Sequence, residues 1–509
     1  MGGNERPVDL AVIGGGITGA AVARDASLRG LTVALFEKGD FSSGTTSKTS
    51  RLIHGGLRYL EGYHFGLVVE SLRERDWLFS RLPHLLRPLP ILIPVYRGGR
   101  RGRGTVWLGM RLYDLLARRK ETPRYGTLPA GEVARRVPGI RKEGLAGGAL
   151  YYDYQLIVPE RLVIENLLSA AVSGARVRNH AEVEGVGHAE GVFRLRLRDR
   201  LSGAREEVAA AAVVNATGPW ADRTRRLFGL DGAILYPTKG THLVFPGASP
   251  HALLTPSPHP LFTSSPKDDR MFYILPFSGS LLVGTTDTAF SGDPDAAEPT
   301  GEDVAYLRES AEEVFPASSP FRSAPLFSYA GVRPLLRGRE TEESRVPRKH
   351  GVFREGPGGR FLTVAGGKMT TFRKMAEDAV DAACAALGRR VPCPSRQVPF
   401  PGEIGGGKEG AEAFTRALAG MYGAPADLCA HLVSLYGRRA ARVLEIAKET
   451  PGGRRTLSPH SLDIAAQAVL AAREEWARTP EDAILRRMHL GITRNRGKEA
   501  VPEVERILA

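Results

Sequence analysis

Cysteine is scarce in this chain, and its scarcity limits the chemistry that the polypeptide can perform alone. The 509 residues include only Cys384, Cys393 and Cys429, and no two of these form a C-x-x-C pair. A zinc site or a dithiol redox pair needs closely spaced cysteines, and a disulfide framework needs a larger set. We therefore expect no disulfide framework and no metal site, and any redox chemistry must come from a bound cofactor.

Long hydrophobic runs are missing as well. No stretch of about eighteen uncharged apolar residues occurs, so a transmembrane helix is not expected. Residues 1–7 contain no apolar signal region, and we therefore expect a protein that stays in the cytoplasm. With 509 residues, 42% of them hydrophobic, the chain can bury the cores of about two or three domains.

Acidic residues are too few to balance the basic ones. The net charge is +14 and the pI about 9.8, which is compatible with nucleic acid, anionic lipid or an anionic substrate as a partner. No zinc-finger spacing, RNP-type aromatic pattern or unstructured basic tail is present, so nucleic acid is not expected. An Arg-rich, thermally robust surface is the alternative explanation of the charge, and it stays open.

A glycine-rich turn opens the part of the chain that carries chemistry. It reads Gly14-Gly15-Gly16-Ile17-Thr18-Gly19 and follows a predicted apolar strand at Leu10–Ile13. A helix-compatible stretch, a second strand at 32–36 and Glu37 come next, which is typical of a dinucleotide-binding βαβ unit. The glycines allow a tight turn, close approach of a pyrophosphate to the helix N-terminus, and close packing of the helix on the strand. The carboxylate can bind a ribose diol, and it disfavours NADP because it would repel a 2′-phosphate.

The order of predicted elements suggests several domains. Strands and helices alternate over about the first 220 residues, and a β-hairpin is predicted at 191–212. Short β-like runs fill 236–350, which we interpret as a substrate domain over the cofactor, and a last strand is predicted at 361–365. A segment rich in proline and glycine, 392–410, indicates a linker. The remainder has helical patterns, including a helix start at Thr479.

A second motif follows Glu37. Residues 42–59 combine small hydroxyl residues with glycines and end with His54, Arg58 and Tyr59. Histidine titrates near neutral pH and suits proton abstraction from an alcohol, whereas arginine clamps phosphate or carboxylate. From these residues alone, a loop with an incidental histidine is the competing interpretation.

Several separated motifs, taken together, closely resemble the FAD-dependent glycerol-3-phosphate dehydrogenases of the respiratory type. The resemblance covers most of the chain, including the helical C-terminal part. The motifs that carry it are Asp9 to Gly19, Ser50 to Leu60, Asn215-Ala216-Thr217-Gly218-Pro219-Trp220, Gly284-Thr285-Thr286-Asp287, Tyr329 to Leu335, and Gly366-Gly367-Lys368-Met369-Thr370-Thr371.

This resemblance implies the fold and the reaction. The expected fold is α/β and α+β, with a Rossmann-like FAD-binding domain interleaved with a β-rich substrate domain and an all-α C-terminal domain. The expected domains are 1–400, with substrate-binding parts at about 77–150 and 236–350, and 401–509. The expected reaction is oxidation of sn-glycerol 3-phosphate to dihydroxyacetone phosphate by hydride transfer to FAD, with membrane quinone as the final acceptor.

The resemblance also implies roles for single residues. His54 is the expected base, assisted by Arg333, although a family histidine at this place also lies against the flavin. The substrate, and above all its phosphate, is expected to contact Arg58, Tyr59, Arg333, Arg345, Lys368 and Thr370; for Arg345 a surface ion pair is the alternative. FAD is expected to contact Gly14, Gly15, Gly16, Ile17, Thr18, Gly19, Glu37, Lys38, Thr45, Thr46, Ser47, Ser50, His54, Gly55, Val183, Ala216, Thr217, Gly218, Gly367, Lys368, Met369 and Thr370.

A membrane contact is predicted at 97–120. Residues 97–104 are rich in arginine, and 106–120 form a helical pattern that is apolar with a basic end. Such a helix suits the interface of an anionic lipid surface, whereas a core helix with a solvated basic loop is the alternative. We therefore expect a cytoplasmic protein attached peripherally to the inner face of the cell membrane.

Three other functions compete with this hypothesis. A glycerol-3-phosphate oxidase would pass the electrons to oxygen, but such relatives carry an extra internal segment and no insertion is evident here. A flavin amine or amino-acid oxidase of the same fold would need no phosphate clamp. A lipid- or partner-binding protein could keep an inert nucleotide fold. The sequence leaves a homodimer open.

Overall fold

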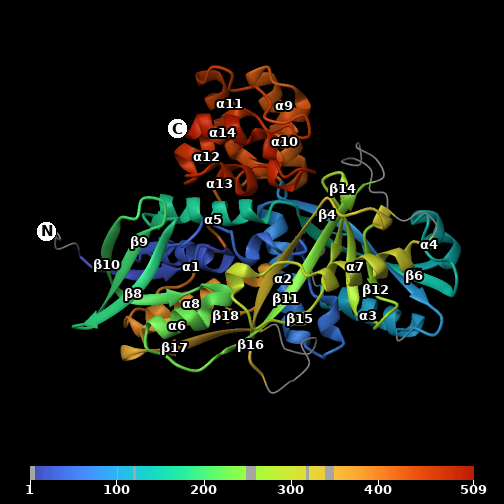
Figure 1. Cartoon of the computed structure of the whole chain (residues 1–509), viewed down its shortest axis with the longest axis horizontal. Coiled ribbons are helices and arrows are strands. Elements are labelled where there is room, and N and C mark those ends of the chain that lie inside the picture. The colour runs from blue at the N-terminus through green and yellow to red at the C-terminus, as the bar shows by residue number, and fades with distance from the viewer. Residues whose placement is uncertain (1–5, 100, 118–121, 248–258, 317–319, 339–348) are drawn as a thin grey trace.

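A computed structural model of the chain describes residues 6–99, 101–117, 122–247, 259–316, 320–338 and 349–509 (Figure 1). Two large sheets form its lower part, and a group of helices from the C-terminal end lies above them (Figure 1). Within the described residues no helix combines the length and the hydrophobicity needed to cross a bilayer. The expected fold class is confirmed.

The first sheet is the nucleotide-binding one. Its central strands are parallel, and both of its faces are covered. The strand order is β17 (His350–Glu355), β18 (Phe361–Gly366), β10 (Arg205–Asn215), β1 (Val8–Ile13), β2 (Val33–Phe36) and β7 (Arg176–Arg178). The predicted strands at 10–13, 32–36 and 361–365 are thus confirmed as β1, β2 and β18.

Helices cover one face of this sheet, and a β-meander packs against the other. The helices are α1 (Ile17–Leu28), α5 (Pro159–Val172) and α8 (Phe372–Ala386), which share one apolar core with the sheet. On the opposite side, β9 (Val192–Asp199) pairs with the first half of β10, and β8 (Ala181–Ala189) pairs with β9. The predicted hairpin at 191–212 is therefore confirmed, because β9 and β10 pair antiparallel across a short turn.

The second sheet draws its strands from distant parts of the chain. One part supplies β3 (Leu52–Ile53), β4 (Leu86–Tyr96), β5 (Gly126–Pro129) and β6 (Leu145–Leu156), and the other supplies β11 (Leu235–Pro246), β12 (Leu261–Ser264), β13 (Met271–Phe277), β14 (Ser280–Gly284), β15 (Thr288–Ala289) and β16 (Phe327–Leu336). These parts meet where β12 pairs with β4. Around this sheet pack α2 (Phe65–Arg81), α3 (Arg103–Leu116), α4 (Ala130–Arg136) and α7 (Gly301–Val314); α6 (Ala221–Leu227) lies between the sheets in sequence.

The C-terminal part is helical. It contains α9 (Gly407–Tyr422), α10 (Ala426–Tyr436), α11 (Ala440–Glu449), α12 (Ala465–Glu474), α13 (Pro480–Arg486) and α14 (Val501–Leu508), drawn in orange and red above α5 (Figure 1). The predicted helix start is confirmed, since Thr479 Oγ1 accepts from the Asp482 amide at 3.2 Å and the Asp482 carboxylate accepts from the Thr479 amide at 3.0 Å. The domain limit at 400/401 stays a prediction.

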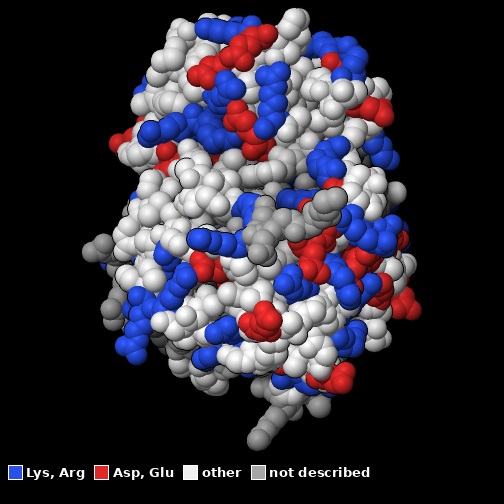
Figure 2. Space-filling view, turned by 90° about the vertical axis from the view of Figure 1, so that its left-hand side faces the viewer, with Lys and Arg blue, Asp and Glu red and all other residues white. Residues whose placement is uncertain are grey.

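Charged side chains are interspersed on the face shown in Figure 2. Lys and Arg lie among Asp and Glu over both the upper and the lower part of this view. This face thus carries charges of both signs rather than of one sign.

Candidate active site

A cavity of about 550 Å³ lies where the two sheets meet. Its walls include the carboxyl ends of β1, β2, β10 and β18 and residues of β11, β13 and β16. In open parallel sheets this edge is where nucleotides bind, because loops diverge there and helix N-termini point toward it. The cavity is therefore the candidate cofactor and substrate site.

The glycine turn leaves no space for side chains. Gly14 has φ of +109°, and a Cβ there would lie 2.6 Å from the Ala216 carbonyl oxygen. A Cβ on Gly19 would lie 1.9 Å from the Gly14 oxygen, so α1 could not pack against the turn as it does. The close packing predicted for these glycines is confirmed. Gly16 and Thr18, at the N-terminus of α1, line the cavity.

Glu37 lines the cavity next to the glycine turn. Its carboxylate accepts from the amides of Gly15 at 2.7 Å and Gly39 at 2.8 Å, one on each oxygen. Burial raises the pKa of Glu37, while these two amides act in the opposite direction. Each carboxylate oxygen keeps a second lone pair, which suits the two hydroxyls of a ribose.

An aromatic side chain also lines the cavity. Trp220 follows the Ala216–Gly218 turn and lines the cavity, and its buried indole Nε1 has no hydrogen-bond partner in the described part of the chain. The Lys38 ammonium lies 4.3 Å from the Trp220 ring centroid and pairs with Asp295 at 2.5 Å. Glycine turn, carboxylate and aromatic ring together fit the adenosine diphosphate half of FAD.

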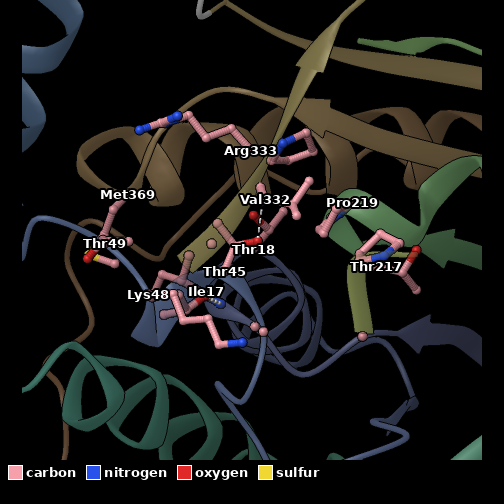
Figure 3. Close-up of a pocket in the computed structure, with 18 of the residues that line it drawn as sticks. Ile17, Thr18, Thr45, Lys48, Thr49, Thr217, Pro219, Val332, Arg333 and Met369 are labelled. Carbon is pink, nitrogen blue, oxygen red and sulfur yellow. Dashed lines mark hydrogen bonds between the residues drawn. The ribbon is translucent and has the colours of Figure 1, made fainter. Parts of the chain in front are cut away.

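A hydroxyl-rich loop joins the two sheets across the cavity (Figure 3). Thr45 Oγ1 donates to the Val332 carbonyl at 2.6 Å, the dashed line in the figure. Thr46 Oγ1 accepts from the Ile17 amide at 3.2 Å. The loop thus lies between α1 and β16 and contacts both.

The other end of the cavity gathers residues that are far apart in the sequence. Thr370 Oγ1 accepts from the His54 amide at 3.1 Å and donates to the His54 carbonyl at 3.2 Å. The Lys368 ammonium lies 3.5 Å from the same carbonyl and 4.6 Å from the centroid of the Tyr59 ring. An imidazole, an ammonium group and a phenol thus share one wall.

Arg333 reaches the cavity from β16 (Figure 3). Its guanidinium pairs with Asp287 at 3.0 Å and donates to Thr285 Oγ1 at 2.9 Å and to the Thr286 carbonyl at 3.1 Å. These partners come from the Gly284–Asp287 motif, so this motif and the motif that contains Arg333 meet beside the cavity. They hold the arginine in one orientation beside the cavity.

Sequence reasoning did not identify His242, although it lines the cavity. It lies on β11, and its Nε2 forms a hydrogen bond of 2.8 Å with Ser50 Oγ. Its ring stacks on the Tyr329 ring, with 4.9 Å between the ring centroids. Burial, with Arg333 nearby, lowers the pKa of His242 to about 3, so the ring is neutral at physiological pH. No local motif marks it, since it stands within a strand of mixed polar and apolar residues.

The structure brings most predicted residues together. Those that line the cavity are Gly14, Gly16, Ile17, Thr18, Glu37, Lys38, Thr45, Thr46, Ser50, His54, Tyr59, Val183, Ala216, Thr217, Gly218, Arg333, Gly367, Lys368, Met369 and Thr370. The side chain of Arg58 and all of Arg345 lie outside the described residues. Lining residues that were not among the predicted cofactor or substrate contacts include Lys48, Thr49, Trp220, His242, Phe262, Met271, Tyr273 and Thr285.

Four predicted cofactor contacts are not part of the cavity lining: Gly15, Gly19, Ser47 and Gly55. A Cβ on Gly15 would lie 2.6 Å from Phe41, so this glycine faces a packed side chain. Ser47 Oγ donates to the Gly44 carbonyl at 3.2 Å and thereby shapes the loop. The Gly55 amide is bound by Tyr113 and Asp153 behind the cavity. These positions shape the walls rather than form their surface.

Comparison with known proteins agrees with this geometry. Residues 9–373 match the family described as FAD dependent oxidoreductase, and residues 393–509 match the C-terminal domain of alpha-glycerophosphate oxidase. A glycerol-3-phosphate dehydrogenase of Synechocystis sp. is 37% identical, over 96% of this chain and 89% of the relative. The chain belongs to the family of FAD-dependent glycerol-3-phosphate dehydrogenases. FAD is its cofactor.

Other relatives are similar over most of their length. An aerobic glycerol-3-phosphate dehydrogenase of Staphylococcus aureus is 33% identical, over 94% of this chain and 86% of the relative. The solved structure of a glycerol-3-phosphate dehydrogenase from Bacillus halodurans complexed with FAD has a TM-score of 0.78 at 29% identity, over 96% of this chain and 87% of that one. A glycine oxidase from Geobacillus kaustophilus, at 23% identity and a TM-score of 0.57 over 78% of this chain and 100% of that one, shares the fold.

Proposed function

We propose that this enzyme oxidises sn-glycerol 3-phosphate to dihydroxyacetone phosphate and delivers the electrons to a membrane quinone. One observation carries the proposal: the Lys368 ammonium, the His54 segment and the Tyr59 ring meet at one end of an FAD cavity. A cation beside a base is what an alcohol that bears a phosphate requires. The names of the relatives in Synechocystis and Staphylococcus support the same substrate.

The phosphate binds at the wall that Lys368 supplies in this proposal. Lys368 and Tyr59 hold its oxygens, together with Thr370, whose hydroxyl already bonds the His54 backbone. Arg58 and Arg345 complete the clamp as proposals from the sequence, because their side chains lie outside the described residues. The remaining glycerol carbons then reach from this wall toward His54 and Arg333.

His54 takes the proton of the C2 hydroxyl, and the C2–H bond breaks with its electron pair. Bound FAD supplies the acceptor for that hydride. Arg333 stabilises the negative charge that develops on the oxygen, and its pairing with Asp287 keeps the guanidinium oriented while this happens. The carbonyl of dihydroxyacetone phosphate is the product at C2.

Helix α3 is the part of the chain that we propose to contact a lipid surface. Trp107, Leu108 and Leu115 on this helix are 43%, 63% and 77% exposed. Arg111 lies on the same helix, 4.7 Å from the centroid of the Trp107 ring. Apolar side chains beside arginines suit the interface of anionic lipid at the inner face of the cell membrane, from which quinone is reached. Residues 118–120 of the predicted basic end lie outside the described residues.

Anaerobic addition of glycerol 3-phosphate to the purified enzyme tests this function, with the flavin absorbance as the readout. We expect bleaching of the flavin and its recovery on addition of a quinone. A flavin that stays yellow contradicts the proposal. We also expect inorganic phosphate to inhibit the bleaching, because it competes for the phosphate clamp that an amino-acid or amine oxidase does not need.

The acceptor is tested separately with oxygen. Peroxide formed with glycerol 3-phosphate and no added acceptor, at a rate that matches quinone reduction, identifies the oxidase alternative. We expect quinone reduction to be faster.

A further inference from the structure

The backbone just after His54 is held by polar groups from two distant elements. The Gly55 amide donates to the Tyr113 hydroxyl at 2.9 Å and to Asp153 Oδ1 at 3.2 Å. Tyr113 lies on the inner side of α3, and Asp153 lies on β6. A helix and a strand that are remote in sequence thus meet behind the predicted base.

This cluster is buried and charge-balanced. Tyr113, Asp153 and Arg75 are 2%, 1% and 1% exposed. The Tyr113 hydroxyl donates to Asp153 Oδ1 at 3.0 Å, and Arg75 Nη1 donates to the same oxygen at 2.7 Å. Burial and the neighbouring Asp153 carboxylate raise the pKa of Tyr113 well above its usual value. The phenol therefore keeps its proton for Asp153, and its oxygen accepts from Gly55.

The backbone around Gly55 is tightly packed. A Cβ on Gly55 would lie 2.3 Å from the Tyr113 hydroxyl and 2.4 Å from Leu72 Cδ2. The carbonyl of the same peptide unit, that of His54, accepts from Thr370 Oγ1 at 3.2 Å. The peptide between His54 and Gly55 is thus bound at both ends, by Thr370 on the cavity side and by Tyr113 behind it.

We propose that Tyr113 is a positioning residue, which fixes the His54 side chain for proton removal through the Gly55 amide. Asp153 and Arg75 orient the phenol that does this. The inference rests on the proposed function, since it gives His54 the role of base. A displacement of about 1 Å at a reacting group can cost about 100-fold in rate, so a loop held this closely matters for catalysis.

Tyr113→Phe in the full-length FAD enzyme tests the inference, because only the hydroxyl is removed. We expect anaerobic flavin reduction by glycerol 3-phosphate to slow about 10- to 100-fold, while the KM changes by less than about threefold because Lys368 is untouched. Hydrogen exchange of residues 52–60 should become faster. Tyr96→Phe is the control: its hydroxyl donates to the Arg141 carbonyl at 3.2 Å, away from the cavity lining.

A reduction rate within about twofold of the wild type, or a loss equal to that of Tyr96→Phe, overturns the inference. If Tyr113→Phe does not fold, hydrogen exchange in the wild-type holoenzyme decides. Strong protection of the Gly55 amide supports the contact, and exchange as fast as that of an open loop overturns it. Failure of the proposed function is distinguishable, because glycerol 3-phosphate would then not reduce the wild-type flavin at all.

Discussion

Lys368 and His54 are 314 residues apart in sequence, yet the Lys368 ammonium lies 3.5 Å from the His54 carbonyl. Lys368 follows β18 of the first sheet, and His54 follows β3 of the second sheet. The contact places a positive charge next to the proposed base. At the scale of single residues, the proposed phosphate-binding group and the proposed base therefore meet on one backbone segment.

Replacing Lys368 by methionine tests the phosphate site. Loss of a hydrogen bond from a charged group costs about 1.5–3 kcal/mol, so we expect the KM for glycerol 3-phosphate to rise about 10- to 100-fold. Steady-state kinetics with a quinone acceptor measures this. Lys267→Met is the control, since this lysine pairs with Glu309 away from the cavity lining. An unchanged KM in the Lys368 variant contradicts the assignment.

Local sequence indicated some of these residues and not others. The glycine turn and Glu37 follow a spacing set by the cofactor, so their pattern is readable without a fold. Tyr113, Asp153 and His242 stand in ordinary helical or strand patterns, and their partners come from other elements. Nothing in their own neighbourhoods distinguishes them from core residues.

Helix α3 has two unlike faces. Its inner side carries Tyr113, which is 2% exposed and bound to Gly55, and its outer side carries Leu108 and Leu115, which are 63% and 77% exposed. The 3.6-residue period separates these positions around the helix axis. The sequence left a core helix and an interfacial helix as alternatives, and the structure leaves the apolar outer side uncovered by described residues of this chain.

A double substitution, Leu108→Glu with Leu115→Glu, tests the lipid contact. Each leucine contributes about 1.5–3 kcal/mol on burial, so binding to phosphatidylglycerol-rich vesicles should weaken at least about 100-fold. Vesicle sedimentation measures the bound fraction. Val172→Glu with Met421→Glu is the matched control, because these residues are also exposed, at 86% and 69%, but lie on α5 and α9. Equal loss in both double variants would sink the assignment to α3.

On the scale of the whole molecule, buried ion pairs join the helical C-terminal part to the nucleotide-binding part. Arg487 donates to both oxygens of Asp40, at 2.7 and 2.9 Å. Asp40 directly precedes the hydroxyl-rich loop that lines the cavity. Arg161 on α5 likewise forms a bidentate pair with Glu475 at the end of α12, at 2.6 and 2.9 Å. The hydroxyl-rich loop and the C-terminal helices are therefore parts of one packed structure.

The Arg161–Glu475 pair predicts a pH dependence of stability. Burial would raise the pKa of Glu475, but Arg161 and Arg439 outweigh it and lower the value to about 2. A depressed pKa stabilises the fold above the ordinary pKa of glutamate, about 4.3, and this contribution is lost as the pH falls toward 2. Stability should therefore decline from about pH 5 downward.

Glu475→Gln should lower the free energy of unfolding at pH 7 by about 3–5 kcal/mol, because it removes the buried carboxylate that pairs with Arg161 and one of the two carboxylates that pair with Arg439. The difference from the wild type should narrow by on the order of 1 kcal/mol at pH 4, where the unfolded glutamate binds a proton. Urea denaturation at both pH values measures this. Glu184→Gln, in the partly exposed pair with Arg198, should cost less than about 1 kcal/mol. A pH-independent difference contradicts the mechanism.

The sequence by itself determined the cofactor end of this protein, since the turn from Gly14 to Gly19, Glu37 and the flanking strands depend on local spacing that any FAD-binding βαβ unit needs. It also determined the helical C-terminal part, through period and capping at Thr479. Only the tertiary structure decided which residues surround His54, which face of α3 is left exposed, and how Asp40 meets Arg487, 447 residues away. The reason is physical: these contacts join side chains across sheets and helices, and a chain pattern of period two or 3.6 records burial but not the identity of the partner.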